Sequence, residues 1–151
     1  MAGLRYFGWQ AIAGSFILGG TLGSCAPTRY AQCSEMFAIA NTAVTEARAL
    51  TDDGQTDNPQ AMLQAADTME AAAQDMETLK LADAQLQAYR ADFANMYRQT
   101  SESTRAFVKA REEFDREAAE DAKDRLERAT AGEPQLVSNI NTYCDSDDSG
   151  S

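Results

Sequence analysis

The sequence predicts an all-α protein, and three observations support this fold class. The 151 residues contain only three prolines, and alanine, the residue with the highest helix propensity, is abundant. The strong β-forming residues are scattered and form no alternating runs, while apolar residues recur every three or four positions. These features predict an antiparallel up-down-up-down four-helix bundle with a longer, partly projecting hairpin between its third and fourth helices.

The first 24 residues have the layout of an export signal. Arg5 precedes an apolar stretch that runs from Trp9 to Leu18, and small residues follow it. Residues 22–25 are Leu-Gly-Ser-Cys, which resembles the lipobox of bacterial lipoproteins, whose cysteine is acylated before cleavage. We therefore expect an exported protein anchored in a membrane by a lipid on Cys25. Two alternatives stay open: an uncleaved transmembrane anchor over 6–24, and plain secretion.

The cysteine count agrees with a lipid on Cys25. Three cysteines are an odd number for an exported protein, but lipidation of Cys25 leaves Cys33 and Cys144 as a pair. We expect these two to form a disulfide in an oxidising compartment, the alternative being two unpaired buried thiols. In the chain-entropy model, closing a loop of this length stabilises a domain by roughly 4 to 5 kcal/mol.

The first half of the predicted bundle is bounded by polar residues. A tether over 25–33 leads into the bundle, which spans 34–144, and the first helix is expected from about Ser34 to Thr51. A polar turn follows over 52–57, and then Asn58 and Pro59 are typical of a helix cap and a first helical position. The second helix continues to about Leu79, and Asp83 is the expected cap of the third.

The third helix carries the clearest packing seam of the sequence. Its members alternate by three and four residues over four heptads: Leu86, Tyr89, Phe93, Met96, Thr100, Ser103, Phe107, Ala110 and Phe114. The chain is expected to reverse near residues 114–116, although neither glycine nor proline marks the turn. A fourth helix follows with a kink at 132–134, and residues 145–151 form an acidic tail that we expect to be disordered.

Helix lengths and topology give two further expectations. The first helix is shorter than the third, so the tip of the second hairpin, around residues 104–126, is expected to project beyond the rest. An up-down-up-down order also puts the start of the first helix and the end of the fourth at one pole. Cys33 and Cys144 lie at those two ends, which is consistent with their pairing.

Composition excludes several classes of function. Lys and Arg total 13 against 24 Asp and Glu, and this acidity disfavours binding to nucleic acids and to anionic headgroups. Histidine is absent, which removes histidine-based catalytic triads and the usual zinc, haem and di-iron sites. The acidic residues Glu113, Glu117, Glu120 and Asp124 form a row, but no loop has the ligand spacing of a calcium site. We expect no metal, no cofactor and no enzymatic activity.

Four short segments carry a resemblance to other proteins. These segments are 30–33, 57–62, 93–98 and 141–144. Together they resemble a group of small exported helical proteins of cyanobacteria that have no assigned activity. The resemblance implies a location at the periplasmic or thylakoid-lumen face of a membrane. The resemblance implies no functional-site residues.

The sequence leads to two hypotheses of function. The first is a non-catalytic, membrane-tethered interaction or assembly module that binds another protein. Its expected partner surface lies on the charged second hairpin, at Arg105, Lys109, Arg111 and Arg116. The alternative is a carrier of a small hydrophobic ligand in the bundle core. Its cavity would be lined by the aromatic residues Tyr89, Phe93, Tyr97 and Phe107.

Overall fold

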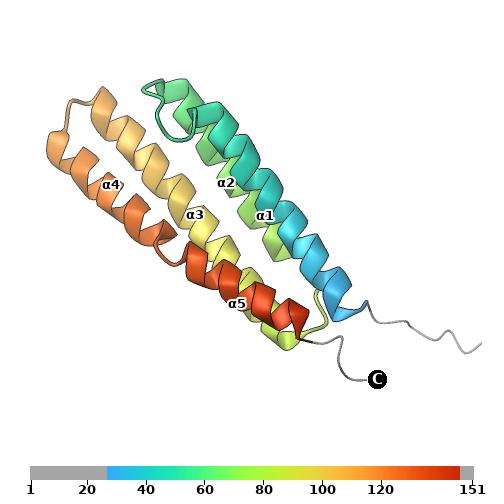
Figure 1. Cartoon of the computed structure of the whole chain (residues 1–151). Coiled ribbons are helices and arrows are strands. Elements are labelled where there is room, and N and C mark those ends of the chain that lie inside the picture. Colours follow the sequence, from blue (N-terminus) through green and yellow to red (C-terminus); the bar gives the residue numbers. More distant parts are fainter. Residues whose placement is uncertain (1–26, 147–151) are drawn as a thin grey trace, which may run out of the picture.

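The computed structural model describes residues 27–146, and the described part is helical throughout apart from its turns, with no β-strand. Figure 1 shows antiparallel helices, in the order α1 (Arg29–Thr51), α2 (Pro59–Thr78), α3 (Ala84–Glu112), α4 (Arg116–Thr130) and α5 (Glu133–Asp145). The predicted all-α class is confirmed. The predicted export signal, Cys25 and residues 147–151 of the predicted tail lie outside the described residues.

Side-chain caps fix where the first four helices begin. Asn58 Oδ1 accepts hydrogen bonds from the N–H groups of Gln60 and Ala61, and Asp83 Oδ1 accepts one from the N–H of Leu86, as the sequence predicted. The start of α1 differs from the prediction. Thr28 Oγ1 accepts a hydrogen bond from Ala31 N–H at 3.2 Å, so α1 begins at Arg29 and takes up part of the expected tether.

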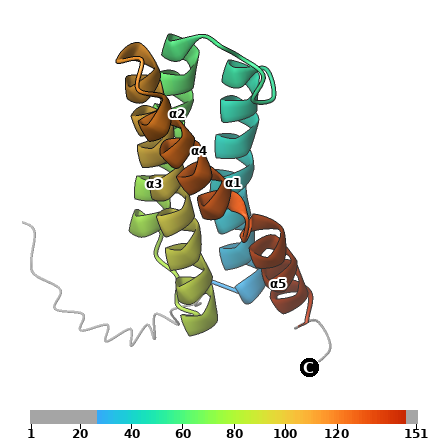
Figure 2. The ribbon, with the colours of Figure 1, turned by 90° about the vertical axis from the view of Figure 1, so that its left-hand side faces the viewer.

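The main core lies between α1, α2 and α3, and α5 completes it at one end (Figure 2). Small alanine side chains cover the inner faces of α1 and α2, which lets these two helices approach closely. The large side chains that are almost fully buried are Met36, Met76, Leu86, Phe93, Tyr97 and Ile140.

The predicted fourth helix consists of two separate helices. α4 ends at Thr130 and α5 begins at Glu133, within the region where the sequence predicted a kink. Pro134 lacks an N–H group and therefore cannot continue the hydrogen bonding of α4. The two pieces pack differently: α4 lies against α3, whereas α5 contacts both α1 and α3.

The seam predicted on α3 is only partly correct. Leu86, Phe93, Met96, Ser103 and Ala110 are buried, and Tyr89, Thr100 and Phe107 are half-buried. Phe114, its expected last member, lies outside the helix and is 95% exposed. Ser101 is buried although the seam did not include it. The reason is that α2 and α4 pack on different sides of α3, so two stripes of that helix are covered instead of one.

The structure does not show the projecting hairpin that the helix lengths predicted. The α1–α2 loop and the α3–α4 turn lie at about the same level, at one end of the bundle (Figures 1 and 2). Arg111 in the last turn of α3 pairs with Asp57, the second residue before α2. α1 begins five residues earlier than expected but is still shorter than α3, and the loop that follows α1 reaches the level of the α3–α4 turn (Figure 1).

Candidate functional site

The cystine pole is the end of the bundle where the N-terminal segment joins α1. It comprises Arg29, Gln32, Cys33, Asp83, Tyr143 and Cys144. The predicted disulfide is present in the structure, with the Cys33 and Cys144 Sγ atoms 2.06 Å apart and a sequence separation of 111. It joins the first turns of α1 to the last turn of α5, and so closes a ring that contains nearly all of the described chain.

Gln32 connects α1 to the α2–α3 connection beside the disulfide. Its Oε1 atom accepts hydrogen bonds from the N–H groups of Ala82 and Asp83, at 2.6 and 3.1 Å, and its Nε2 donates to Pro27 O at 3.0 Å. The side chain is buried. This glutamine therefore supplies an acceptor for two backbone N–H groups that lie 50 and 51 residues away in the sequence.

Asp83 is the polar centre of the cystine pole. Besides capping α3, its carboxylate accepts hydrogen bonds from Tyr143 Oη at 2.9 and 3.1 Å and lies 3.7 Å from Arg29 Nε. Burial acts to raise the pKa of Asp83. The hydrogen bonds from the Leu86 N–H and the Tyr143 hydroxyl, with the nearby Arg29 charge, outweigh burial and lower this pKa below its ordinary value.

The four cations predicted to form a partner surface do not share one free patch. Arg105 Nη1 lies 2.7 Å from Asp67 Oδ1, and Arg111 Nη1 lies 3.3 Å from Asp57 Oδ1. These two residues therefore bridge α3 to α2 and its preceding loop. Lys109 pairs with Glu113 at 3.9 Å within the same segment, while Arg116 is exposed at the start of α4.

The aromatic residues predicted to line a ligand cavity are separated in the structure. Phe93 and Tyr97 are 1% and 2% exposed, and their rings stack with centroids 5.7 Å apart. Tyr89 instead packs edge-on against Tyr143, and the Arg111 guanidinium covers Phe107. These four residues therefore act as packing at three different places, and the described residues show no common cavity among them.

Two buried hydroxyls on α3 have no hydrogen-bond partner among the described protein atoms, those of Tyr97 and Ser101. Burial, together with the charge of Glu133, raises the pKa of Tyr97, which keeps the phenol neutral. Ser101 lies outside the packing seam that the sequence predicted on α3. A neutral hydroxyl in this position contributes no charge to the core.

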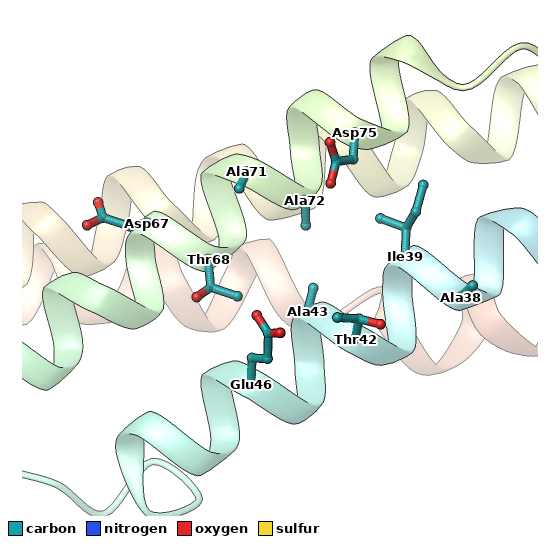
Figure 3. A pocket seen from close by; sticks show the side chains of 10 residues that line it. All are labelled: Ala38, Ile39, Thr42, Ala43, Glu46, Asp67, Thr68, Ala71, Ala72 and Asp75. Carbon is teal, nitrogen blue, oxygen red and sulfur yellow. The ribbon is translucent and has the colours of Figure 1, made fainter.

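An acidic groove runs along the outer side of α1 and α2 (Figure 3). It has a volume of about 550 Å³. Ala43 and Ala72 are part of its floor, and Glu46, Asp67 and Asp75 lie along its edges. Asp67 is already paired with Arg105. The groove is therefore an acidic surface, one of whose carboxylates takes part in holding α3.

The α3–α4 turn presents an aromatic side chain to solvent. Phe114 N–H donates to Arg111 O at 3.2 Å, and Asp115 N–H donates to Ala110 O at 2.9 Å. This pair of hydrogen bonds is the Schellman motif, in which the residue at the Phe114 position takes a left-handed conformation and is usually glycine. Phe114 has φ 57°. We call this turn, together with the α1–α2 loop beside it, the distal pole (residues 52–58 and 109–117).

None of the described helices combines the length and apolarity that crossing a bilayer requires. Within residues 27–146, no three Cys, Asp or Glu side chains are grouped so that they could hold a metal ion. Of the predicted acidic row, Glu113 lies just after α3 and pairs with Lys109 at 3.9 Å.

Comparison with known proteins identifies no relative of this chain. No family model, curated protein or solved structure matches the chain. The resemblance to exported cyanobacterial proteins stays a prediction.

Proposed function

We propose that this protein is a non-catalytic interaction or assembly module, held by a lipid on Cys25 at the extracytoplasmic face of a membrane. The observation that carries the proposal is the disulfide at the cystine pole. Disulfides persist in exported proteins, and the Cys33–Cys144 bond leaves Cys25 as the unpaired cysteine, next to a lipobox-like sequence.

The position of the disulfide also supports a tethered domain. It lies at the end of the bundle where α1 begins, four residues into that helix. A lipid on Cys25 would hold the protein from the same end. The α1–α2 loop and the α3–α4 turn would then point away from the anchor, about 40 Å along α3.

The test of the anchor is the intact mass of the protein purified from its native membrane, with and without reductant. We expect the mass of residues 25–151 plus acyl chains, and a gain of two hydrogens on reduction. A mass that retains the leader would replace the lipid with a membrane span. An unmodified mature mass would contradict anchoring, and native mass spectra with a bound lipid or pigment would favour the carrier hypothesis.

The test of the interaction role is chemical cross-linking in the same membranes. Photoreactive groups at several exposed positions over both poles should join the domain to at least one other protein. Matched samples of the purified domain alone give the background of self-association. A domain that cross-links to no protein from any position would contradict the proposal.

A further inference from the structure

Phe114 is the most exposed large apolar side chain among the described residues. Of the large hydrophobic residues there, only Phe114 and Tyr30 are exposed, at 95% and 75%. Tyr30 carries a hydroxyl that water can solvate, whereas the Phe114 ring has no polar atom. Burial of an aromatic side chain stabilises a fold, and this exposed ring contributes no such stabilisation.

The backbone at Phe114 is unfavourable for the residue that occupies it. Its φ of 57° lies in the left-handed region, which bulky L-residues rarely adopt. Glycine or asparagine at this position would relieve the strain and would also remove the exposed ring. Two independent features, exposure and conformation, therefore both disfavour phenylalanine in the isolated protein.

The turn holds this ring in a fixed place. The hydrogen bonds from Phe114 N–H to Arg111 O and from Asp115 N–H to Ala110 O define its backbone, and the Asp115 side chain caps α4 through the Ala118 N–H. Ala110 is buried. A side chain presented on a pre-ordered backbone loses little conformational entropy on binding, which suits it to anchor an interface.

The surroundings of Phe114 are acidic. Within the distal pole, carboxylates outnumber cations: Asp52, Asp53, Asp57, Glu112, Glu113, Asp115 and Glu117 against Lys109, Arg111 and Arg116. Lys109 and Arg111 are also paired with Glu113 and Asp57. This charge disfavours anionic lipid headgroups, and it disfavours a second copy of an acidic chain, but it complements Lys and Arg on another protein.

We propose that Phe114 is the anchor by which the distal pole binds a partner protein, entering an apolar pocket whose rim is basic. The inference rests on the proposed interaction role and names the surface that performs it. Aromatic residues at the centre of an interface commonly supply much of its affinity, while surrounding charges set specificity and association rate. The expected interface is therefore small and centred on one ring.

The experiment places a benzophenone amino acid at position 114 of the full-length protein and irradiates native membranes. Gln55, exposed in the α1–α2 loop, and Tyr30, exposed at the other pole, receive the same group as matched controls. The cross-linked peptides are sequenced. Position 114 should join one partner protein at apolar residues flanked by Lys or Arg, with a yield at least ten times that from position 30.

Substitutions then separate binding from folding. Phe114→Asn should weaken association with that partner by about 30-fold or more, the size expected for an interface anchor, while Phe114→Leu should retain part of it. The midpoint of unfolding of the Asn variant should equal or exceed that of the wild type. A clearly lower midpoint would give Phe114 a structural role and overturn the inference.

The other outcomes are equally decisive. Cross-links from position 114 to lipid or to a second copy of this chain would overturn the assignment of a protein pocket. A protein joined from Gln55 or Tyr30 but not from 114 would overturn the role of Phe114 and leave the interaction module standing. Cross-links to no protein from any position would overturn both.

Discussion

The two ends of the bundle are held in different ways. At the cystine pole, a disulfide and the hydrogen bonds of Gln32 and Asp83 join α1, the α2–α3 connection and α5. At the distal pole, the α3–α4 turn is closed by its own backbone, and the contact to the neighbouring loop is the exposed Arg111–Asp57 pair. Exposed ion pairs contribute about 0 to 1 kcal/mol, so tertiary restraint is concentrated at one end.

Removing the disulfide is the strongest way to test this contrast. Cys33→Ser and Cys144→Ser should each lower the free energy of unfolding by about 3 to 5 kcal/mol, because the bond closes a loop of 111 residues. Urea unfolding with and without reductant measures the loss. Reductant should have no further effect on the double variant. A loss below about 1 kcal/mol would show that the cystine pole is held by its other contacts.

Truncating one buried side chain in each of α4 and α5 compares how much these two helices contribute to stability. They lie where the sequence predicted a single fourth helix. Ile140 is the buried residue of α5 and Ala122 that of α4. Ile140→Ala should destabilise the domain by about 2 to 4 kcal/mol. Ala122→Gly should lose about 1 kcal/mol, mainly through helix propensity. Chemical denaturation of both variants checks the order, and a larger effect at Ala122 would show that α4 holds the bundle more strongly than α5.

Substituting the buried Gln32 tests the hydrogen bonds of the cystine pole while the disulfide stays intact. Gln32→Met keeps the length of the side chain but leaves the N–H groups of Ala82 and Asp83 without their acceptor. We expect a loss of about 1 to 3 kcal/mol. Gln55→Met, at an exposed position of the distal pole, is the matched control and should change stability by less than about 0.5 kcal/mol. Equal effects would remove the distinction between the poles.

Acid should weaken the cystine pole through Asp83. Its pKa is lowered in the folded protein, so its contribution is present above the unfolded-state value and is lost as the pH falls through the folded-state value. Unfolding free energies measured from about pH 6 down to about pH 2 should therefore fall less steeply in Asp83→Asn than in the wild type. Parallel curves would show that Asp83 does not contribute to acid sensitivity.

The smallest effect is expected at the distal pole. Arg111→Gln removes the pair with Asp57 and the guanidinium over Phe107, and should lower the unfolding free energy by at most about 1 kcal/mol. High salt should reduce the difference between variant and wild type. A loss comparable to that of Gln32→Met would mean that the distal pole is restrained as strongly as the cystine pole.

Local sequence signals predicted much of the fold. Asn58 before Pro59, and Asp83, marked helix starts because a short polar side chain followed by a helical pattern has a direct capping role. The interruption at 132–134 followed from glycine and proline chemistry. The pairing of Cys33 and Cys144 followed from cysteine count and topology. Each of these inferences used residues near one another in sequence, or a constraint that only a few arrangements satisfy.

Other features depend on tertiary contacts that no local pattern reports. Gln32 is buried beside the α2–α3 connection, where its Oε1 atom accepts a hydrogen bond from the N–H of Ala82, 50 residues away in the sequence. Ser101 is buried because α3 is covered on two sides, which a single seam does not represent. Phe114 continued the apolar spacing of α3, so periodicity placed it in the core. The cations Arg105 and Arg111 were assigned to a partner surface, and their ion-pair partners Asp67 and Asp57 are too distant in sequence for a local pattern to report.

The disulfide also makes the domain behave as a covalent ring. Any single break in the chain between residues 34 and 143 leaves two fragments that are still joined through Cys33 and Cys144. A protease that cut the exposed link between α4 and α5 at Gly132 would therefore release nothing until a reductant acted. If the protein is anchored at Cys25, both fragments would stay on the membrane, so nicked molecules would persist there beside intact ones.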